Sequence, residues 1–418
     1  MSPAEIHELP PPARIPRVWT VLFSLCSLIG MIAFLVGVSG PHPLRAWQAY
    51  LINYVFWAGL SFGAVLFAAI LNLADAAWGR PLKRLAEGFG AFLPISFLLF
   101  WVLYLGREEI FPWVREPVHE KEGWLNVGFM FARNGVGLCM LTVLSLGLIY
   151  CSVKADRKYS SPATGPAPAG PRVEPQESVY WRAQRVLSPL IAIVYAFVLS
   201  LLAFDLIMSL DPHWYSTLFG AYYFISSFYV ALAALYLLSQ IFLRFSGSRE
   251  RLRAYLHPHH IHDLGKLVFA FCLFTGYLFF VQFLVIWYGN LPEETRYVIL
   301  RVRFTPWEPV GWVILSLIFA VPFVGLLRRR SKMNPWVIMI VSGMILAGMW
   351  LERFILVAPS IWKGEGLPLG LLEVLISAGF LGLMALSLAA FLRRVPFFPV
   401  ADPLFKKSVE HHEEKVKP

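Results

Sequence analysis

The chain has 418 residues, of which 58% are apolar and only 15% are charged, whereas an ordinary soluble domain carries about 25% charged residues. A soluble fold of this length needs a far more polar surface, so the composition excludes a soluble enzyme or binding module. The formal charge of +10 does not indicate nucleic-acid binding, because the Lys and Arg residues cluster in short loops between apolar runs. That pattern is typical of membrane topology and lipid contact.

Ten apolar runs are long enough to cross a bilayer, which takes about 20 residues. The first run follows a Pro-rich head and has no cleavage site after it, so we interpret it as a retained helix. The sequence therefore predicts an all-α integral membrane protein with about ten transmembrane helices, at residues 18–38, 47–72, 86–105, 128–151, 187–210, 216–243, 263–288, 307–327, 334–357 and 369–392.

The basic residues are distributed unevenly between the two sides of the membrane. The N-terminus, the even-numbered loops and the C-terminus hold most of them, for example Arg80, Lys83 and Arg84 after the second run. The positive-inside rule then places both termini in the cytoplasm. We divide the chain into a cytoplasmic N-terminal segment, helices one to four, a flexible cytoplasmic linker, helices five to ten and a cytoplasmic tail, at residues 1–17, 18–151, 152–186, 187–392 and 393–418. The centre of the linker, 155–178, is rich in Pro, Gly and Ser, as flexible connections are.

Charged residues within membrane spans carry functional information, because each is costly in hydrocarbon unless it is paired or hydrated. Toward the outer side we place Arg133, Asp205, Glu308, Glu352, Arg353 and Glu373, and toward the inner side Asp75, Glu87, His262, Asp263 and Lys266. For Asp75, Glu87, Glu308 and Asp263 we favour ordinary helix-terminal charges. Asp205, Glu352 and Arg353 lie deeper, and for them we favour a function.

The sixth run carries hydroxyl groups on one helical face. Tyr222, Ser226, Tyr229 and Tyr236 recur at spacings of three, four or seven residues. This stripe either relays protons or serves as contact between helices, and the sequence leaves both readings open. We expect Asp205 to be an unpaired, protonated acid at the depth of Tyr222, with Lys266 at the inner end of the path and Arg353 keeping Glu352 charged.

Ligands for a redox centre are not apparent in the sequence. The four cysteines stand singly, and no histidine lies in the middle of a run, where a membrane haem needs its axial pair. The histidines at 257–262 could bind a metal, but we favour a basic interfacial loop. Any redox role of this chain therefore involves protons or a lipid-soluble carrier, and we expect electron carriers to reside in other subunits.

Three segments resemble a known family. They are Phe204–Thr217 (FDLIMSLDPHWYST), the motif His262–Lys266 with Gln282, Trp287 and Pro292–Thr295 downstream, and Met349–Phe354 (MWLERF). Together they are similar to the F-subunit family of bacterial alternative complex III, a quinol:cytochrome c oxidoreductase. That family is of the NrfD/polysulfide-reductase C-subunit type, and the resemblance covers residues 15–395.

The resemblance implies two four-helix bundles, made of helices two to five and six to nine, flanked by helices one and ten. It implies a place in the bacterial cytoplasmic membrane, with quinol or menaquinol as a candidate ligand at a site that the sequence leaves unknown. It implies pentahaem, iron–sulfur, monohaem and sister NrfD-like membrane subunits as partners, which hold haem c and the iron–sulfur clusters. A proton path in this family would fall here on Asp205, Tyr222, Ser226, Tyr229, Tyr236, Asp263, Lys266, Glu352 and Arg353.

Two other functions stay open. Ten helices with buried acids also suit a proton-coupled secondary transporter, in which interrupted helices recur in matching halves. Pro94 and Pro322 interrupt the third and eighth runs, but the halves show no convincing repeat. The remaining alternative is a structural membrane anchor for redox subunits.

Overall fold

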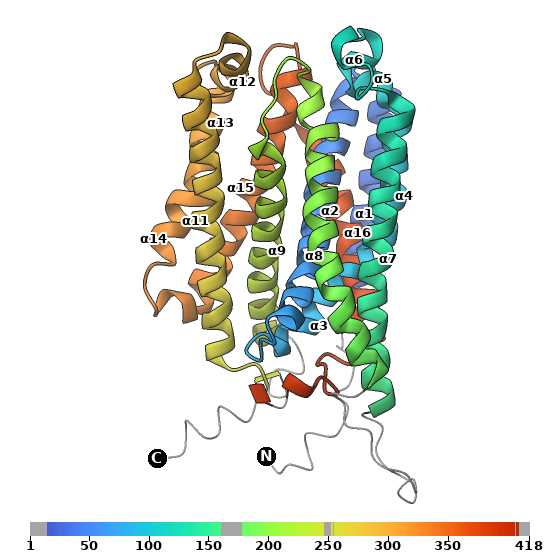
Figure 1. The fold of residues 1–418 in the computed structure, drawn as a ribbon, viewed down its shortest axis with the longest axis vertical. Helices are drawn as coiled ribbons and strands as arrows, with labels where there is room; N and C mark the ends of the chain where they lie inside the picture. The colour runs from blue at the N-terminus through green and yellow to red at the C-terminus, as the bar shows by residue number, and fades with distance from the viewer. Residues whose placement is uncertain (1–14, 160–177, 246–251, 254, 406, 409–418) are drawn as a thin grey trace, which may run out of the picture.

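The structure is a computed structural model that describes residues 15–159, 178–245, 252–253, 255–405 and 407–408. Ten helices in these residues are long and apolar enough to cross a membrane (Figure 1). The elements are α1 (Arg17–Val38), α2 (Pro43–Leu73), α3 (Arg80–Phe89), α4 (Leu93–Leu105), α5 (Arg107–Ile110), α6 (Pro112–Arg115), α7 (Val127–Tyr159), α8 (Val179–Leu206), α9 (Leu218–Phe245), α11 (Pro258–Gly289), α12 (Pro292–Val302), α13 (Trp307–Leu315), α14 (Val321–Gly325), α15 (Pro335–Ile361) and α16 (Leu371–Leu392).

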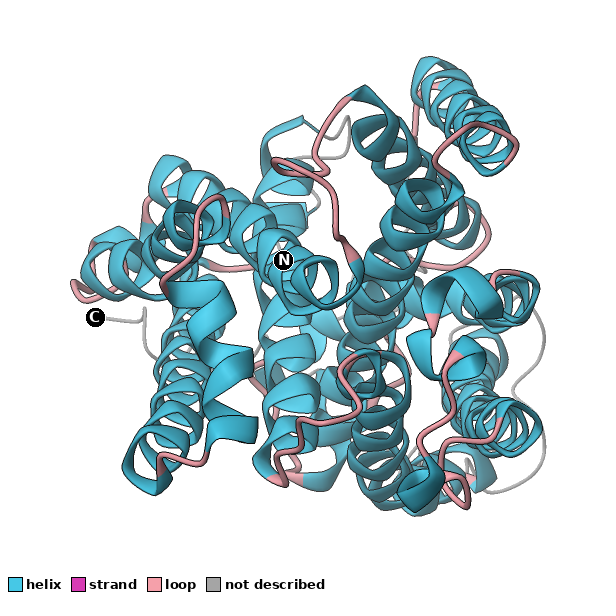
Figure 2. Ribbon diagram, turned by 90° about the horizontal axis from the view of Figure 1, so that it is seen from above, coloured by secondary structure: helices cyan, strands magenta, loops and turns pink. Residues whose placement is uncertain are grey.

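The packing of the helices divides them into two bundles that meet where α2 contacts α9, and Figure 2 shows the whole set of helices from above. In the first bundle α2 packs on α8 and α4, and α7 packs on α8 and α4. In the second, α9 packs on α11 and α15, and α13 packs on α15. Helices α2 and α9 contact each other between the bundles and are the most buried spans.

Helices α1 and α16 form a separate pair beside the first bundle. They cross so closely at Gly30 and Gly379 that a Cβ atom on Gly379 would lie 2.8 Å from the Cα of Gly30. Small residues at such a crossing allow backbone contact, which stabilises helix pairs where no hydrophobic effect acts between helices. The two flanking helices are therefore held to each other as well as to the bundle.

The expected architecture of ten helices is confirmed, and the ends of the helices differ from the expected runs by a few residues in most cases. The third run is broken by a 3-10 turn at Gly90–Phe92, and the eighth by a π-helical turn at Ser316–Ala320. The largest extensions are at α7, which continues to Tyr159, and at α8, which begins at Val179. Both helices reach into the expected linker 152–186, because charged residues can extend a helix beyond the hydrocarbon; residues 160–177 lie outside the described part.

We call the two ends of the molecule the α3 end and the α12 end, after the helices that mark them in Figure 1. The first and last membrane helices both reach the α3 end, where Arg393 Nη2 donates a hydrogen bond to the carbonyl of Ile15 (2.8 Å). The positive-inside rule predicts that the α3 end is cytoplasmic, and this orientation stays a prediction.

A buried cluster of charges closes the α3 end of the first bundle. Arg80 and Lys83 each contact Asp402 at 2.8 Å, with side chains at most 3% exposed. Arg84 pairs with both Glu87 and Asp156 and is equally buried. The interpretation of these three basic residues as loop charges, and of Glu87 as an ordinary terminal charge, is therefore wrong. Acids from α7 and from the segment after α16 neutralise them inside the protein.

Candidate functional site

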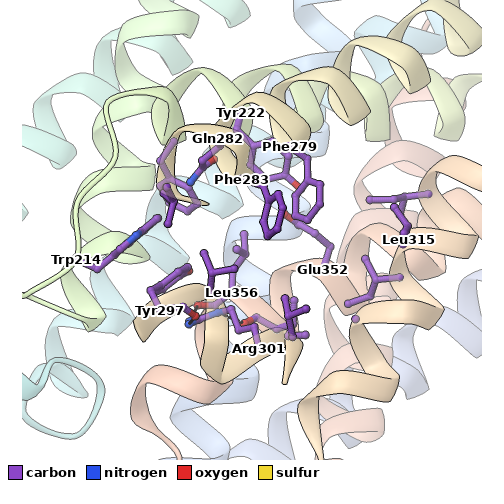
Figure 3. Close-up of a pocket in the computed structure, with 18 residues that line it drawn as sticks. Trp214, Tyr222, Phe279, Gln282, Phe283, Tyr297, Arg301, Leu315, Glu352 and Leu356 are labelled. Atoms are coloured by element: carbon purple, nitrogen blue, oxygen red, sulfur yellow. Dashed lines mark hydrogen bonds between the residues drawn. The ribbon is translucent and has the colours of Figure 1, made fainter. Parts of the chain in front are cut away.

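A cavity of about 140 Å³ lies inside the second bundle at the α12 end (Figure 3). Its walls come from α9, α11, α12, α13, α15 and the loop before α9, and most of them are aromatic or aliphatic. The lining residues are Trp214, Phe219, Tyr222, Phe279, Gln282, Phe283, Ile286, Tyr297, Val298, Arg301, Val302, Gly311, Ile314, Leu315, Ile318, Glu352, Ile355 and Leu356. A mainly apolar cavity with a few polar groups is the usual form of a small-molecule site.

Glu352 is the acid of this cavity, and it is 3% exposed. Its Oε2 accepts a hydrogen bond from Arg353 Nη1 at 2.5 Å. Its Oε1 is buried and makes no hydrogen bond of ordinary geometry among the described residues, and the Tyr222 hydroxyl, which lines the same cavity, lies close enough to interact with this carboxyl. Because a buried carboxylate oxygen without a partner is strongly unfavourable, this atom is suited to hold a proton or to accept a hydrogen bond from a ligand.

Arg353 is held in place from α9. Its Nη2 donates to Ser226 Oγ at 2.8 Å and lies 3.3 Å from Ser227 Oγ. Its guanidinium stands 4.5 Å from the ring centroid of Tyr223. The expected pairing of Glu352 with Arg353 is confirmed, and Ser226 belongs to this network.

Aromatic stacking shapes the opposite wall. Trp214 and Tyr297 stack with centroids 3.7 Å apart and planes at 6°. The hydroxyl of Tyr297 and the indole N–H of Trp214 are buried without partners in the described residues. Burial raises the pKa of Tyr297, which lies in α12 outside the membrane spans, to about 12. This hydroxyl therefore stays protonated at physiological pH and is available as a donor.

Arg301 of α12 contributes a charge that no acid among the described residues neutralises directly. It donates to the carbonyls of Ile355 and Tyr297 at 2.9 Å each and to Ser360 Oγ at 2.7 Å. Burial lowers its pKa from the ordinary value, but guanidinium groups remain protonated in proteins. The wall of the cavity thus carries a positive charge next to its aromatic residues.

Asp205 is not the unpaired acid that the sequence predicted. Arg133 Nε donates to its Oδ2 at 2.8 Å, and the indole of Trp124 donates to Oδ1 at 3.0 Å. Asn134 Nδ2 also donates to Oδ2, at 2.5 Å. The partners come from α7 and the loop before it, about 70 residues away in the chain, and Arg133 itself stacks on Trp124 at 3.9 Å. The acid that the sequence predicted to be unpaired is therefore one partner of a buried ion pair with Arg133.

The hydroxyl stripe of α9 makes contacts with other helices. Tyr229 donates to the carbonyl of Ile318 at 3.0 Å, and Tyr236 donates to the carbonyl of Lys332 at 2.7 Å. Tyr222 lines the cavity with Glu352. These bonds join α9 to neighbouring elements, and the role of the stripe in proton transfer stays a prediction.

Lys266 and Asp263 lie in the turn of α11 that holds Gly265, where a Cβ atom on Gly265 would lie 2.5 Å from the hydroxyl of Tyr236. They form an ion pair at 2.5 Å near the start of α11, and the Lys266 side chain is 57% exposed. Within the described ranges, no three His, Cys, Asp or Glu residues are grouped so that they could hold a metal ion. Haem c and iron–sulfur centres therefore remain an expectation for partner subunits.

The sequence did not identify most of the cavity. Trp214 and Gln282 were within the resembling motifs, but nothing indicated that they face Glu352. Tyr297 and Arg301 lie in a short helix outside the ten runs, and the phenylalanines of α11 resembled lipid-facing residues. The useful signals were the depth of Glu352 in its run and the hydroxyl stripe that includes Tyr222.

The comparisons with known proteins agree with this arrangement. The family model described as polysulphide reductase, NrfD, matches residues 19–363, which is most of the chain and includes every wall of the cavity. No curated protein matches the sequence. The chain therefore belongs to the polysulphide reductase NrfD family, whose members are membrane subunits of redox enzyme complexes.

Proposed function

We propose that this chain is a membrane subunit of a quinol:cytochrome c (or high-potential iron–sulfur protein) oxidoreductase of the alternative complex III type. Its partners are a pentahaem, an iron–sulfur, a monohaem and a sister NrfD-like subunit in a bacterial cytoplasmic membrane. The family match supports the place in a redox complex, and the three motifs support the type. Its own contribution is to bind a quinol ring and to move protons.

The buried carboxyl of Glu352, which lies beside the Tyr222 hydroxyl in a cavity with aromatic walls, carries this proposal. A quinol has a flat apolar ring that suits such walls, and its hydroxyl needs a hydrogen-bond acceptor. Oxidation of the quinol releases two electrons and two protons. The electrons pass to the redox centres of the partner subunits, Glu352 accepts one of the two protons while Arg353 holds the carboxylate in position, and the other proton passes to water.

The cavity is also close to the lipid, from which a quinol must enter. Phe279 and Phe283 line it and are 49% and 36% exposed on the outer face of α11. Gln282 lies between them in the sequence and faces the cavity (Figure 3). A ring can therefore enter between α11 and its neighbours without crossing a polar surface.

Replacement of Glu352 with Gln in the purified complex tests the proposal. The Glu352→Gln substitution keeps the size of the side chain but removes its ability to take a proton, so we expect kcat for quinol oxidation to fall by about 10²-fold. Glu308→Gln is the matched control, because Glu308 starts α13 at the same end of the molecule and does not line the cavity.

The turnover of the two variants should differ clearly. Retention of the full subunit set by both variants, with loss of turnover only in Glu352→Gln, is the expected result. Equal turnover in Glu352→Gln and the unmodified complex would reject the cavity as a site of quinol chemistry.

A further inference from the structure

Two lysines from separate elements come close together at the α3 end of the second bundle. Lys266 lies near the start of α11, and Lys332 lies in the 3-10 turn at Ser331–Met333, between α14 and α15. Burial lowers the pKa of Lys332, and the charge of Lys266 lowers it further. The two ammonium groups are therefore near enough to repel each other, which is unfavourable unless a negative charge compensates them.

The described residues supply little negative charge at this place. Asp263 pairs with Lys266 at 2.5 Å. Lys332 is 8% exposed and pairs with no acid in the described ranges, and its Nζ donates to the carbonyl of Leu327 at 3.3 Å. The three arginines at 328–330 belong to the same loop and are exposed. Positive charge is therefore in excess around the two lysines.

Lys332 is held in place by two neighbouring helices. Its carbonyl accepts a hydrogen bond from the hydroxyl of Tyr236 in α9 at 2.7 Å. A Cβ atom on Gly265 of α11 would lie 2.5 Å from that hydroxyl and 3.2 Å from the Cβ of Lys332. Glycine at this position thus allows α9, α11 and the turn to converge. Because the backbone of Lys332 is fixed, less conformational entropy is lost when its ammonium group binds an anion.

An apolar surface continues from the lysines toward the centre of the membrane, along α11 and α14, which contact each other (Figure 1). Lys332 Nζ lies 5.1 Å from the ring centroid of Phe269. The ring of Phe269 stacks on Phe323, and Phe323 stacks on Phe319, with centroids 5.7 and 5.9 Å apart. Val324, next to Phe323 in the sequence, is exposed. The surface is therefore basic at the α3 end and apolar beyond it.

We propose that this place, which we call the lysine site, binds an anionic phospholipid. Its phosphate lies between Lys266 and Lys332, and an acyl chain lies along Phe269 and Phe323. The phosphate compensates the two ammonium groups, and the acyl chain covers the apolar surface that a free phosphate or an acidic peptide would leave bare. Basic pockets between membrane helices on the cytoplasmic side are typical of sites for acidic headgroups. The proposal does not depend on quinol oxidation.

Native mass spectrometry of the purified full-length chain in a neutral detergent tests the lysine site. The probes are dioleoyl phosphatidylglycerol, dioleoyl phosphatidylcholine, which has no net charge, and inorganic phosphate. One basic residue near a membrane surface strengthens the binding of acidic lipid by about fivefold. We therefore expect Lys266→Gln combined with Lys332→Gln to weaken the binding of phosphatidylglycerol by about 25-fold. Binding of phosphatidylcholine should not change.

Arg182→Gln combined with Arg185→Gln is the matched control. Both arginines are exposed on α8 at the α3 end of the first bundle. Arg185 pairs with Asp75, as Lys266 pairs with Asp263, so the two double variants remove the same charge and one ion pair each. The control should bind phosphatidylglycerol as the unmodified chain does.

Three results would overturn the lysine site. They are an equal loss of phosphatidylglycerol binding in the two double variants, equal binding of phosphatidylglycerol and phosphatidylcholine by the unmodified chain, and inorganic phosphate that binds as tightly as phosphatidylglycerol. The last of these would identify a site for a free anion rather than for a lipid.

The melting temperature of Lys332→Gln gives a second readout. The substitution removes the repulsion with Lys266, so the melting temperature in neutral detergent should not fall, while its rise on addition of phosphatidylglycerol should be lost. Lys332→Arg keeps the charge and should keep the rise. A purely structural role of Lys332 predicts a lower melting temperature in Lys332→Gln and an unchanged rise with lipid, and this result would overturn the lysine site.

Discussion

Removal of the Asp402 side chain should strongly destabilise the protein. Asp402 Oδ2 accepts hydrogen bonds from Arg80 Nη1 and Lys83 Nζ, both at 2.8 Å. Asp402→Ala would leave these two cations, which are at most 1% exposed, without the acid that they share. Breaking a buried ion pair from one side costs about 3–5 kcal/mol, so we expect a loss of that size in the free energy of unfolding.

The measurement is an unfolding titration with sodium dodecyl sulfate of the detergent-solubilised chain, followed by tryptophan fluorescence. Asp75→Ala is the control, because Asp75 pairs with Arg185 at 3.4 Å where both side chains are more than half exposed. Such surface pairs contribute at most about 1 kcal/mol. Equal and small losses in the free energy of unfolding of the two variants would refute the view that buried ion pairs hold the segment after α16 against the first bundle.

Three further predictions follow from the described contacts. Burial raises the pKa of Asp402, but Lys83 and Arg80 lower it more, so the pKa of Asp402 in the folded protein lies below its usual range. The ionised Asp402 therefore stabilises the fold fully above about pH 4, its pKa in the unfolded chain. This contribution to the free energy of unfolding is lost as the pH falls through the pKa of the folded state. A stability profile that declines between about pH 8 and pH 5 instead would contradict this. Asp205→Asn should preserve assembly of the complex, because the amide oxygen can still accept a hydrogen bond from Arg133 or Trp124. The variant should lower the number of protons moved per electron in liposomes. An unchanged number of protons per electron would reject a role for Asp205 in proton transfer. Gly379→Leu should separate α1 from α16 and lower the melting temperature of the protein. Gly343→Leu is the control and should not lower the melting temperature, because the space around the Cβ position of Gly343 is open. Similar melting temperatures for the two variants would argue against the close crossing of α1 and α16.

Much of the fold could be predicted from hydropathy alone. Each membrane span needs about 20 apolar residues whatever its neighbours are, and for that reason the runs around Gly30 or Ser342 could be located without any knowledge of packing. The ends of α7 and α8 could not, because helical turns that contain polar and charged residues carry no hydropathy signal, even where the protein buries them as it does Asp156.

Pairing between distant charges could not be predicted in the same way. The partner of Asp205 is Arg133, and that of Lys83 is Asp402, more than 300 residues further along the chain. A single sequence shows which charges lie deep but not which ones meet. Glu352 and Arg353 were paired correctly because they are adjacent in the sequence. The cavity escaped prediction because its walls come from separate segments whose apolar side chains resemble lipid-facing ones.

The central claim is that this chain is a subunit of a quinol-oxidising complex. The most direct measurement is purification of the chain, tagged at its chromosomal locus, followed by quantification of co-purified subunits, haem c, iron and quinol oxidation. The account predicts haem-bearing and iron–sulfur subunits in fixed stoichiometry, together with quinol oxidation whose kcat falls about 10²-fold in Glu352→Gln. A monodisperse lone chain, free of these subunits and able to bind a solute, would contradict it.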